Sequence, residues 1–331
     1  MRFYVSKCHD YLNGENFSPE DYSTYLCLNP YYKNVTINKG RRKLMIDSGA
    51  FQDVGNDSRI TPLEALDRQL NFEKTLHGKI AESIVSYDRL VDEQLDQVNG
   101  QVKKRVSEKT ATDYVKETIE AAAFLSNSRK RLGKRIPILS CQGVNTEQYI
   151  KCLKEILALA DTKDIIGFGG FCIISQKREY ENDYYEVIKK AMPLIKDAGI
   201  SRIHVFGLGL FRALLQTDIY CRLNKIEASY DTSSPELNAT FGRVFNPTGP
   251  CLSNAFSKNH KINGYHPAAI SKFNIIMINQ FWKEFQNVPL PERFEPSYEY
   301  ARNIMKAKNR INAVEGILLA ATDPTQSILE I

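Results

Sequence analysis

The sequence predicts a single-domain α/β barrel of the triosephosphate-isomerase type, (β/α)8, on three observations. Short apolar runs alternate with amphipathic helical stretches at least six times between residues 43 and 230. No linker rich in proline, glycine or serine interrupts the series. The 331 residues suit one large α/β barrel or two smaller domains, and a right-handed series this long closes most easily as a barrel. A doubly wound open sheet remains the alternative.

The first half of the series has clear helix starts. An apolar strand over 43–46 is followed by a helix from Thr61 and Pro62 to about residue 77, since proline suits the first helical turn. A buried strand over 81–87 comes next. Ser107 and Asn145 are good N-cap residues. They open helices to about 126 and 160, on either side of a strand over 136–140.

The second half continues the alternation. Its expected strands are 164–168, 202–206 and 225–230. Its expected helices are 180–198, 211–223, 266–286 and 297–320, and Gly199 ends the first of these helices. We therefore expect one domain over 1–331, with C-terminal helices over 266–331. The first 40 residues are rich in tyrosine and asparagine and show no readable pattern, so we expect an irregular N-terminal segment.

Composition excludes several classes of protein. Hydrophobic residues make up 43% and charged residues 25%, which excludes disordered, coiled-coil and collagen-like chains. No apolar run approaches the roughly 20 residues that span a bilayer, and residues 1–7 lack a secretory signal, so we expect no membrane partner. Seven scattered cysteines without C-x-x-C spacing favour a reduced, cytoplasmic compartment. A net charge of +5 permits a polyanionic partner.

Polar or glycine-rich residues follow six consecutive strands. In chain order these are Asp47-Ser48-Gly49-Ala50-Phe51-Gln52, Asp88, Gln142-Gly143, Gly167-Phe168-Gly169-Gly170, Phe206-Gly207-Leu208-Gly209 and Asp231-Thr232-Ser233-Ser234. In a barrel the carboxyl ends of all strands meet on one face, where active sites are built. Each residue also has a structural interpretation, because an Asp after a strand often caps the next helix and a Phe often belongs to the core.

Three carboxylates at one barrel mouth suggest glycosyl transfer. One carboxylate can attack an anomeric carbon while a second handles the proton of the leaving group. A third carboxylate and an amide can form hydrogen bonds with the donor edge of a purine-like base. Composition alone leaves other barrel chemistries open.

These motifs resemble a known family, the tRNA-guanine transglycosylases. Residues 47–52 are similar to its Asp-Ser-Gly-Gly-Phe-Gln motif, and Asp88, Gln142-Gly143, Gly169-Gly170, His204–Gly209 and Tyr230-Asp231 resemble its later motifs in the same order. The resemblance spans about residues 43–235. It implies a barrel in which Asp231 is the nucleophile that forms a covalent glycosyl-enzyme and Asp47 is the general acid/base.

The same resemblance implies the base-binding residues and the absence of a cofactor. Phe51 and Phe206 would sandwich the ring of the base. Recognition of the base would fall to Asp88, Gln142, Gly169 and Gly170, with Ser48 and Gly207 also lining the pocket.

Two departures from the family change the expected polymer. The family's zinc subdomain needs C-x-C-x-x-C and a distant histidine, but Cys251 is the only cysteine after Asp231, so we expect no metal. The Arg-rich segment after the nucleophile reads Thr232–Leu237 here. The chain therefore looks more like the related DpdA-type branch, phage members included, which exchanges guanine in DNA for a 7-deazaguanine such as 7-cyano-7-deazaguanine. If the chain is phage-encoded, its compartment would be the host cytoplasm. The tRNA reaction, or a catalytically inactive nucleic-acid-binding barrel, is the alternative.

Basic residues that follow strands should lie on the same face as the site. The candidates for phosphate contacts are Lys103, Lys104, Arg105, Lys177, Arg178, Arg243, Lys258 and Lys261. The basic clusters over 39–43 and 129–135 precede strands, so we expect them on the opposite face, exposed to solvent.

Overall fold

The computed structural model forms a closed barrel of eight parallel strands, which confirms the predicted (β/α)8 class and excludes the open sheet. The structure describes residues 1–6, 25–32, 35, 43–55, 59–76, 78–96, 101–172, 174, 177–245 and 267–306. Around the barrel the strands are β1 (Arg2–Ser6), β10 (Glu227–Thr232), β9 (Arg202–Val205), β8 (Ile165–Phe168), β7 (Ile136–Cys141), β4 (Ser83–Val85), β3 (Lys43–Ile46) and β2 (Tyr25–Leu28).

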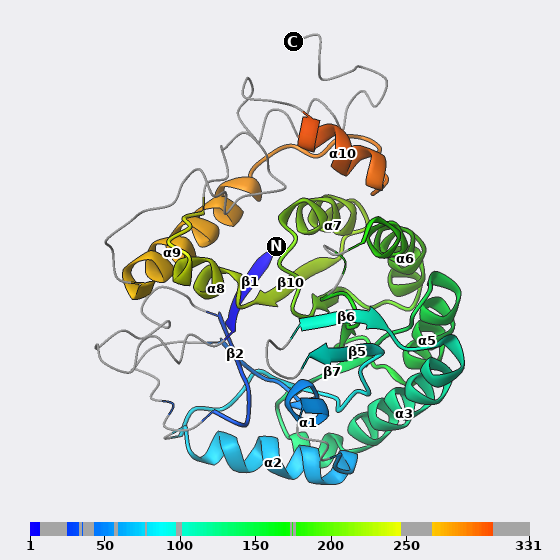
Figure 1. The fold of residues 1–331 in the computed structure, drawn as a ribbon. Coiled ribbons are helices and arrows are strands. Elements are labelled where there is room, and N and C mark those ends of the chain that lie inside the picture. The colour runs from blue at the N-terminus through cyan, green and yellow to red at the C-terminus, as the bar shows by residue number, and fades with distance from the viewer. Residues whose placement is uncertain are drawn as a thin grey trace.

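Helices surround the barrel, as Figure 1 shows. They are α1 (Ala50–Gly55), α2 (Pro62–Lys74), α3 (Glu108–Asn127), α4 (Arg129–Leu132), α5 (Thr146–Leu159), α6 (Arg178–Asp197), α7 (Phe211–Leu223), α8 (Ser234–Thr240), α9 (Pro267–Phe285) and α10 (Tyr298–Lys306). An antiparallel hairpin of β5 (Asp92–Asp96) and β6 (Gln101–Arg105) lies in the connection from β4 to α3. No described helix has the length and apolar character needed to cross a membrane.

Local sequence signals set several helix boundaries as predicted. The Thr61 hydroxyl accepts from the Glu64 N–H while the Glu64 carboxylate accepts from the Thr61 N–H, which makes a capping box before Pro62. Ser107 and Asn145 cap α3 and α5 through their side chains. The expected helix over 297–320 appears as α10, and the remainder of that range lies outside the described residues.

The expectation of an irregular segment over residues 1–40 is wrong, because two barrel strands lie within it. Strand β1 pairs with β10 and with β2, and β2 pairs in turn with β3, so these two strands close the barrel. Each is only four or five residues long and buries short runs, Phe3-Tyr4-Val5 and Leu26-Cys27-Leu28. The 18 residues between the two runs show no amphipathic helical pattern in the sequence, so the alternation that marked the equally short β3 was missing here.

The interior of the barrel is filled up to the level of the site. Buried Tyr4, Cys27, Met45, Val85 and Ile138 form one apolar cluster inside the strands, and a larger core separates the strands from the helices. The floor of any pocket at the carboxyl ends is therefore made of packed side chains.

The basic cluster over 129–135 is not simply exposed to solvent, contrary to our expectation. Arg129 donates to both oxygens of buried Asp164, and Arg135 pairs with buried Glu73. Each arginine thus neutralises a carboxylate that would be costly to bury alone.

Candidate active site

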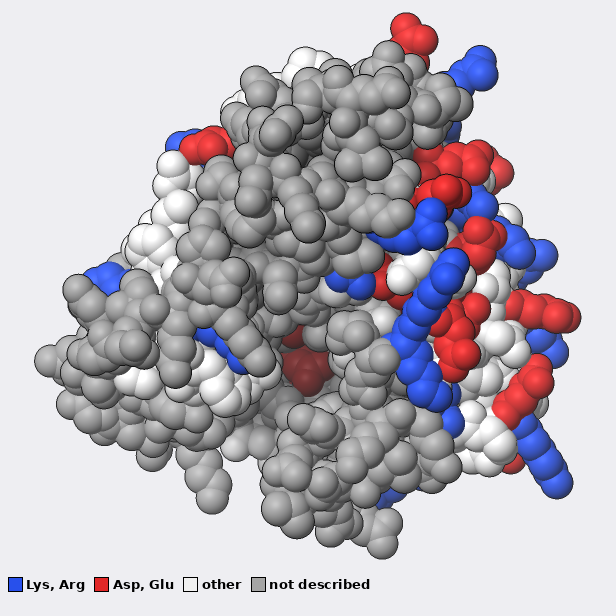
Figure 2. Space-filling model, turned by 45° about the horizontal axis from the view of Figure 1, so that its top comes forward, with Lys and Arg blue, Asp and Glu red and all other residues white. Residues whose placement is uncertain are grey.

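The carboxyl ends of the strands meet on the face that carries the β5–β6 hairpin, drawn in front of the barrel in Figure 1. Figure 2 shows acidic side chains on the floor of a hollow near the middle of the molecule. Asp47 directly follows β3, Asp88 lies three residues after β4, and Asp231 is near the end of β10. The structure thus brings the three predicted carboxylates to one mouth.

Asp47 is held at the end of β3 by its neighbours on the β2 side. Its backbone N–H donates to Leu28 O at 2.9 Å. Asn29 Nδ2 donates to Asp47 Oδ2 at 3.1 Å and to Gln52 Oε1 at 2.6 Å, and Gly49 N–H approaches Asp47 Oδ2 at 3.4 Å. The carboxyl group is therefore fixed in orientation by the end of β2 and by its own loop.

Asp231 receives two donors on a single oxygen. His204 Nε2 lies 3.1 Å from Asp231 Oδ1, and the Gly207 N–H donates to the same atom at 3.0 Å. Gly207 has φ +62°, and a Cβ there would lie 2.7 Å from Cys172 Sγ, so glycine is required for this donor geometry. Both hydrogen bonds found for this side chain among the described residues fall on Oδ1.

The two carboxyl groups influence each other. Burial first, and then the charge of Asp231, raise the pKa of Asp47 to about 6, against the lowering effect of two backbone N–H groups and His204. Both groups also act on Cys27, whose pKa is raised well above its usual value by burial and then by the charges of Asp231 and Asp47. A proton can therefore reside on Asp47 up to about pH 6.

Helix α2 supports the loop that carries Asp47. Arg68 donates from Nη2 to Ser48 O at 2.6 Å and to Asp53 Oδ2 at 3.0 Å, and from Nη1 to Asp53 Oδ1 at 3.0 Å. The next residue, Gln69, donates from Nε2 to the carbonyls of Ile46, Asp47 and Val85. Two consecutive residues of one helix thus fix the ends of two strands.

Asp88 lies where a base-reading group is expected. It is buried, and its Oδ2 is 3.4 Å from the position that a Cβ on Gly169 would occupy. Gly170, with φ +76°, follows. Both glycines are buried, and atoms of Asp88, Val91 and Gln142 lie within 4.0 Å of the positions that their Cβ atoms would occupy, so glycine permits the close packing of these loops.

Gln142 lies beside these glycines, but its amide bonds the protein itself. Its Nε2 donates to Arg89 O and to Thr118 Oγ1, and its Oε1 accepts from the Val91 N–H at 3.2 Å. The side chain is fully buried. In this arrangement Gln142 fixes the loop that carries Asp88, and its own hydrogen-bonding groups are already used.

The two aromatic candidates have different environments. Phe51 on α1 is 40% exposed. Phe206 is half-buried, and its ring packs edge-on to His204 with centroids 4.6 Å apart. A Cβ on Gly167 would lie 2.5 Å from Phe206 Cε2, so only glycine at 167 lets the ring lie over the barrel floor. Ser48 is buried, and its hydroxyl accepts from the Ala50 N–H.

The basic candidates divide into internal and exposed residues. Arg105 is buried and donates to Val144 O and Asp183, so it anchors the hairpin inside the protein. Lys177 and Arg178 are exposed at the start of α6, and Arg243 is half-buried over the Phe241 ring. Lys258 and Lys261, and the side chains of Lys103 and Lys104, lie outside the described part of the structure.

Four residues that the sequence did not assign to the site lie near the carboxyl pair or the loop that carries Asp47. These are Asn29, Tyr32, Arg68 and His204. Burial first, and then its neighbours Cys27, Asp47 and Asp231, raise the pKa of half-buried Tyr32, which places it beside the pair. Only His204 had a sequence signal, its position two residues before Phe206 in a strand-end motif.

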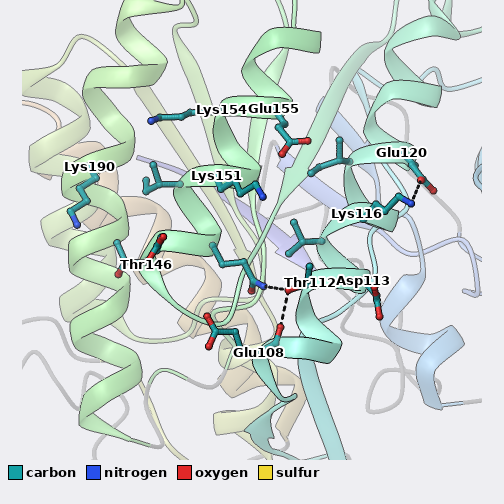
Figure 3. Close-up of a pocket in the computed structure, with 15 residues that line it drawn as sticks. Glu108, Thr112, Asp113, Lys116, Glu120, Thr146, Lys151, Lys154, Glu155 and Lys190 are labelled. Atoms are coloured by element: carbon teal, nitrogen blue, oxygen red, sulfur yellow. Dashed lines mark hydrogen bonds and ion pairs between the residues drawn. The ribbon is translucent and has the colours of Figure 1, made fainter.

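A separate groove lies outside the barrel, between α3, α5 and α6 (Figure 3). It has a volume of about 1100 Å³ and charged walls of both signs, including Lys116, Lys151 and Glu155. None of the predicted site residues lines it. Within the described ranges no three His, Cys, Asp or Glu side chains are grouped as metal ligands.

Known proteins offer little sequence similarity to this chain. No family model and no curated protein matches it. Among solved structures it is similar to an L-ribulose 3-epimerase, with 11% sequence identity, a TM-score of 0.36, and coverage of 82% of this chain and 89% of the epimerase.

Proposed function

We propose that this protein replaces guanine in DNA with a 7-deazaguanine, such as 7-cyano-7-deazaguanine, through a covalent aspartyl-glycosyl intermediate. The observation that carries the proposal is the unequal carboxyl pair at the barrel mouth. Asp231 has two donors on one oxygen, whereas Asp47 has a pKa raised to about 6. Donors on the carboxylate suit Asp231 to the nucleophile's role, and a pKa near neutrality suits Asp47 to general acid/base work.

The reaction divides into two balanced displacements. Asp231 Oδ2 attacks the anomeric carbon, the bond from that carbon to guanine breaks, and its electron pair leaves with the base, which takes a proton from Asp47. The incoming 7-deazaguanine then gives its proton to the Asp47 carboxylate, and its nitrogen attacks the anomeric carbon. Asp231 leaves as a carboxylate, so both groups return to their starting states.

The remaining site residues suit the recognition of a guanine-like base. The buried Asp88 carboxylate can accept from ring N–H and amino donors of the base, and Gly169 and Gly170 pack the loop beside this carboxylate. Phe206 offers a ring near the barrel floor for stacking.

DNA is favoured over tRNA by the sequence. The chain lacks the cysteine spacing of a zinc subdomain and an Arg-rich segment after Asp231. A guanine in duplex DNA is stacked and paired, so the nucleotide must be flipped out or presented in a single strand. Exposed Lys177 and Arg178 at the start of α6 are candidates to bind flanking phosphates.

Nucleoside mass spectrometry tests the proposal. DNA and tRNA are digested from cells that express the wild-type chain or Asp231→Asn and that are supplied with a 7-deazaguanine. We expect the deaza-nucleoside in DNA of wild-type cells only. If the deaza-nucleoside appears in tRNA alone, the substrate is tRNA and not DNA. If it appears in neither while the protein still binds nucleic acid, the protein is a catalytically inactive nucleic-acid-binding barrel.

A further inference from the structure

His204 is a fully buried histidine at the barrel mouth whose ring is clamped from two sides. Its ring packs edge-on to Tyr4, with centroids 5.6 Å apart, and to Phe206, with centroids 4.6 Å apart. Gly167 is its partner in the register of β8 and β9. These packing contacts alone therefore restrict the orientation of the His204 ring.

Both ring nitrogens of His204 have polar partners. Nδ1 lies 3.0 Å from Ser229 Oγ, and Nε2 lies 3.1 Å from Asp231 Oδ1. Ser229 Oγ also donates to Ile203 O at 2.9 Å, and a hydroxyl has only one proton to give. Ser229 must then accept from Nδ1–H. An ionised Asp231 can only accept, so Nε2 carries a proton as well.

The groups that face His204 from the neighbouring strands are consistent with a positive ring. Burial raises the pKa of Tyr4 on β1 and of Cys27 on β2, so both stay neutral. The acidic neighbours are Asp231 on β10 and Asp47 at the end of β3. A buried cation beside two carboxyl groups is stabilised by them, and it reduces their mutual repulsion.

We infer that His204 is a positioning residue for Asp231, a buried imidazolium that donates through Nδ1 to Ser229 and through Nε2 to Asp231. The term positioning rests on the proposed function, whereas the protonation pattern does not. His204 occupies Oδ1 together with the Gly207 N–H, so Oδ2 is turned to the substrate. A charged donor also makes a stronger hydrogen bond to the Asp231 carboxylate than a neutral donor would.

Nitrogen-15 NMR of histidine-labelled protein tests the protonation pattern without any substrate. The His204 signals are assigned by their loss in His204→Gln. We expect both ring nitrogens to be protonated in the wild type, and one proton to be lost in Asp231→Asn, which removes the carboxylate. Ser229→Ala, which removes the acceptor at Nδ1, should also shift the Nδ1 signal. A neutral, singly protonated ring in the wild type would overturn the inference.

The positioning role is tested by the rate of covalent adduct formation with guanine-containing DNA. His204→Leu removes the donor, and we expect the rate to fall about 10- to 100-fold, the effect of losing one hydrogen bond to a charge. His204→Gln restores an amide donor and should recover part of that loss, with the apparent affinity for the base unchanged. Wild-type rates in folded His204→Leu would refute the role.

The two measurements separate this inference from the proposed function. If the wild type forms no adduct but shows a doubly protonated His204, the proposed reaction fails and the protonation pattern stands. If the wild type forms the adduct and the ring is neutral, the inference alone fails. Should His204→Leu not fold, Ser229→Ala and the NMR signals still decide the question.

Discussion

The charge of Asp231 raises the pKa of Asp47, although β10 and β3 are separated in the barrel by β1 and β2. The two groups act on each other because both project over the same mouth, above the packed floor that includes Cys27. Burial and this repulsion together raise the pKa of Asp47 to about 6. Two carboxyl groups placed in this way need not be ionised together.

Replacement of Asp47 by Asn should stabilise the protein, and more so at high pH. The pKa of Asp47 is about 6 in the folded protein and 3.8 for the free group, so the folded state binds more protons between these values. Stability is therefore lost as the pH rises from about 4 to about 6. An Asn at position 47 does not ionise and loses no stability in this way. We therefore expect the free energy of unfolding of Asp47→Asn, relative to the wild type, to increase by about 1–3 kcal/mol between about pH 4 and about pH 8.

Urea unfolding of the wild type and Asp47→Asn at the two pH values measures this change. Asp67→Asn, at a half-exposed carboxylate of α2, is the matched control and should show little pH dependence. An advantage of Asp47→Asn that does not change with pH would contradict a raised pKa at Asp47.

Loss of Arg68 should weaken both the fold and the site. Arg68→Gln breaks the two-point pair with Asp53 and the bond to Ser48 O, and leaves buried Asp53 without its cation. We expect a loss of about 2–3 kcal/mol, somewhat below that of a fully buried pair. Denaturant unfolding is the measurement. Arg131→Gln, which breaks an exposed pair with Asp67, should cost less than about 1 kcal/mol, and equal costs would contradict the anchoring role.

Phe206 and Gly167 should act together on base binding. Phe206→Ala should lower base affinity by roughly 1–3 kcal/mol, the range of aromatic–base stacking. Gly167→Ala should displace the same ring, since its Cβ would lie 2.5 Å from Phe206 Cε2. Calorimetric titration with the free base measures both changes, and the double variant should lose little more than Phe206→Ala alone. If Phe206→Ala binds the free base with unchanged affinity, Phe206 is a core residue and does not stack on the base.

Lys103 and Lys104 should differ from Arg105 in their effect on DNA binding. Neutralising the two lysines should weaken binding and lower the slope of log K against log salt by up to about one unit for each phosphate that a lysine neutralises in the wild type. Arg105→Gln should instead destabilise the β5–β6 hairpin, because Arg105 is bonded to Val144 O and Asp183 inside the protein. Fluorescence anisotropy over a range of salt concentrations measures the slope, and an unchanged slope in the double lysine variant would exclude a phosphate-binding role for this pair.

Local signals in the sequence predicted much of the fold and the position of the carboxylates. The helix starts at Thr61, Ser107 and Asn145 and the strand end before Asp47 are all encoded by nearby residues. A barrel then brings strand ends together without further information. Strands β1 and β2 were missed although β3 is equally short, because the 18 residues between them carry no amphipathic pattern that would mark a strand–helix alternation.

The contacts that support the site could not be predicted from the sequence for a different reason. Asn29 meets Asp47 across 18 positions, and Arg68 meets Ser48 across 20. Gln142, which the sequence places among the base-binding residues, bonds Arg89 across 53 positions. Such pairs depend on tertiary geometry that no local pattern records. His204 shows the same limit, since its partners Ser229 and Asp231 lie on the next strand.

The most direct test of the account is covalent trapping on Asp231. Wild-type protein is incubated with guanine-containing single-stranded DNA without an incoming base, and the products are separated under denaturing conditions and mapped by mass spectrometry. The account predicts a protein–DNA adduct on Asp231 that disappears when a 7-deazaguanine is added, and no adduct with Asp231→Asn, since an amide is a poor nucleophile. An adduct on another residue, or base exchange by Asp231→Asn at the wild-type rate, would contradict it.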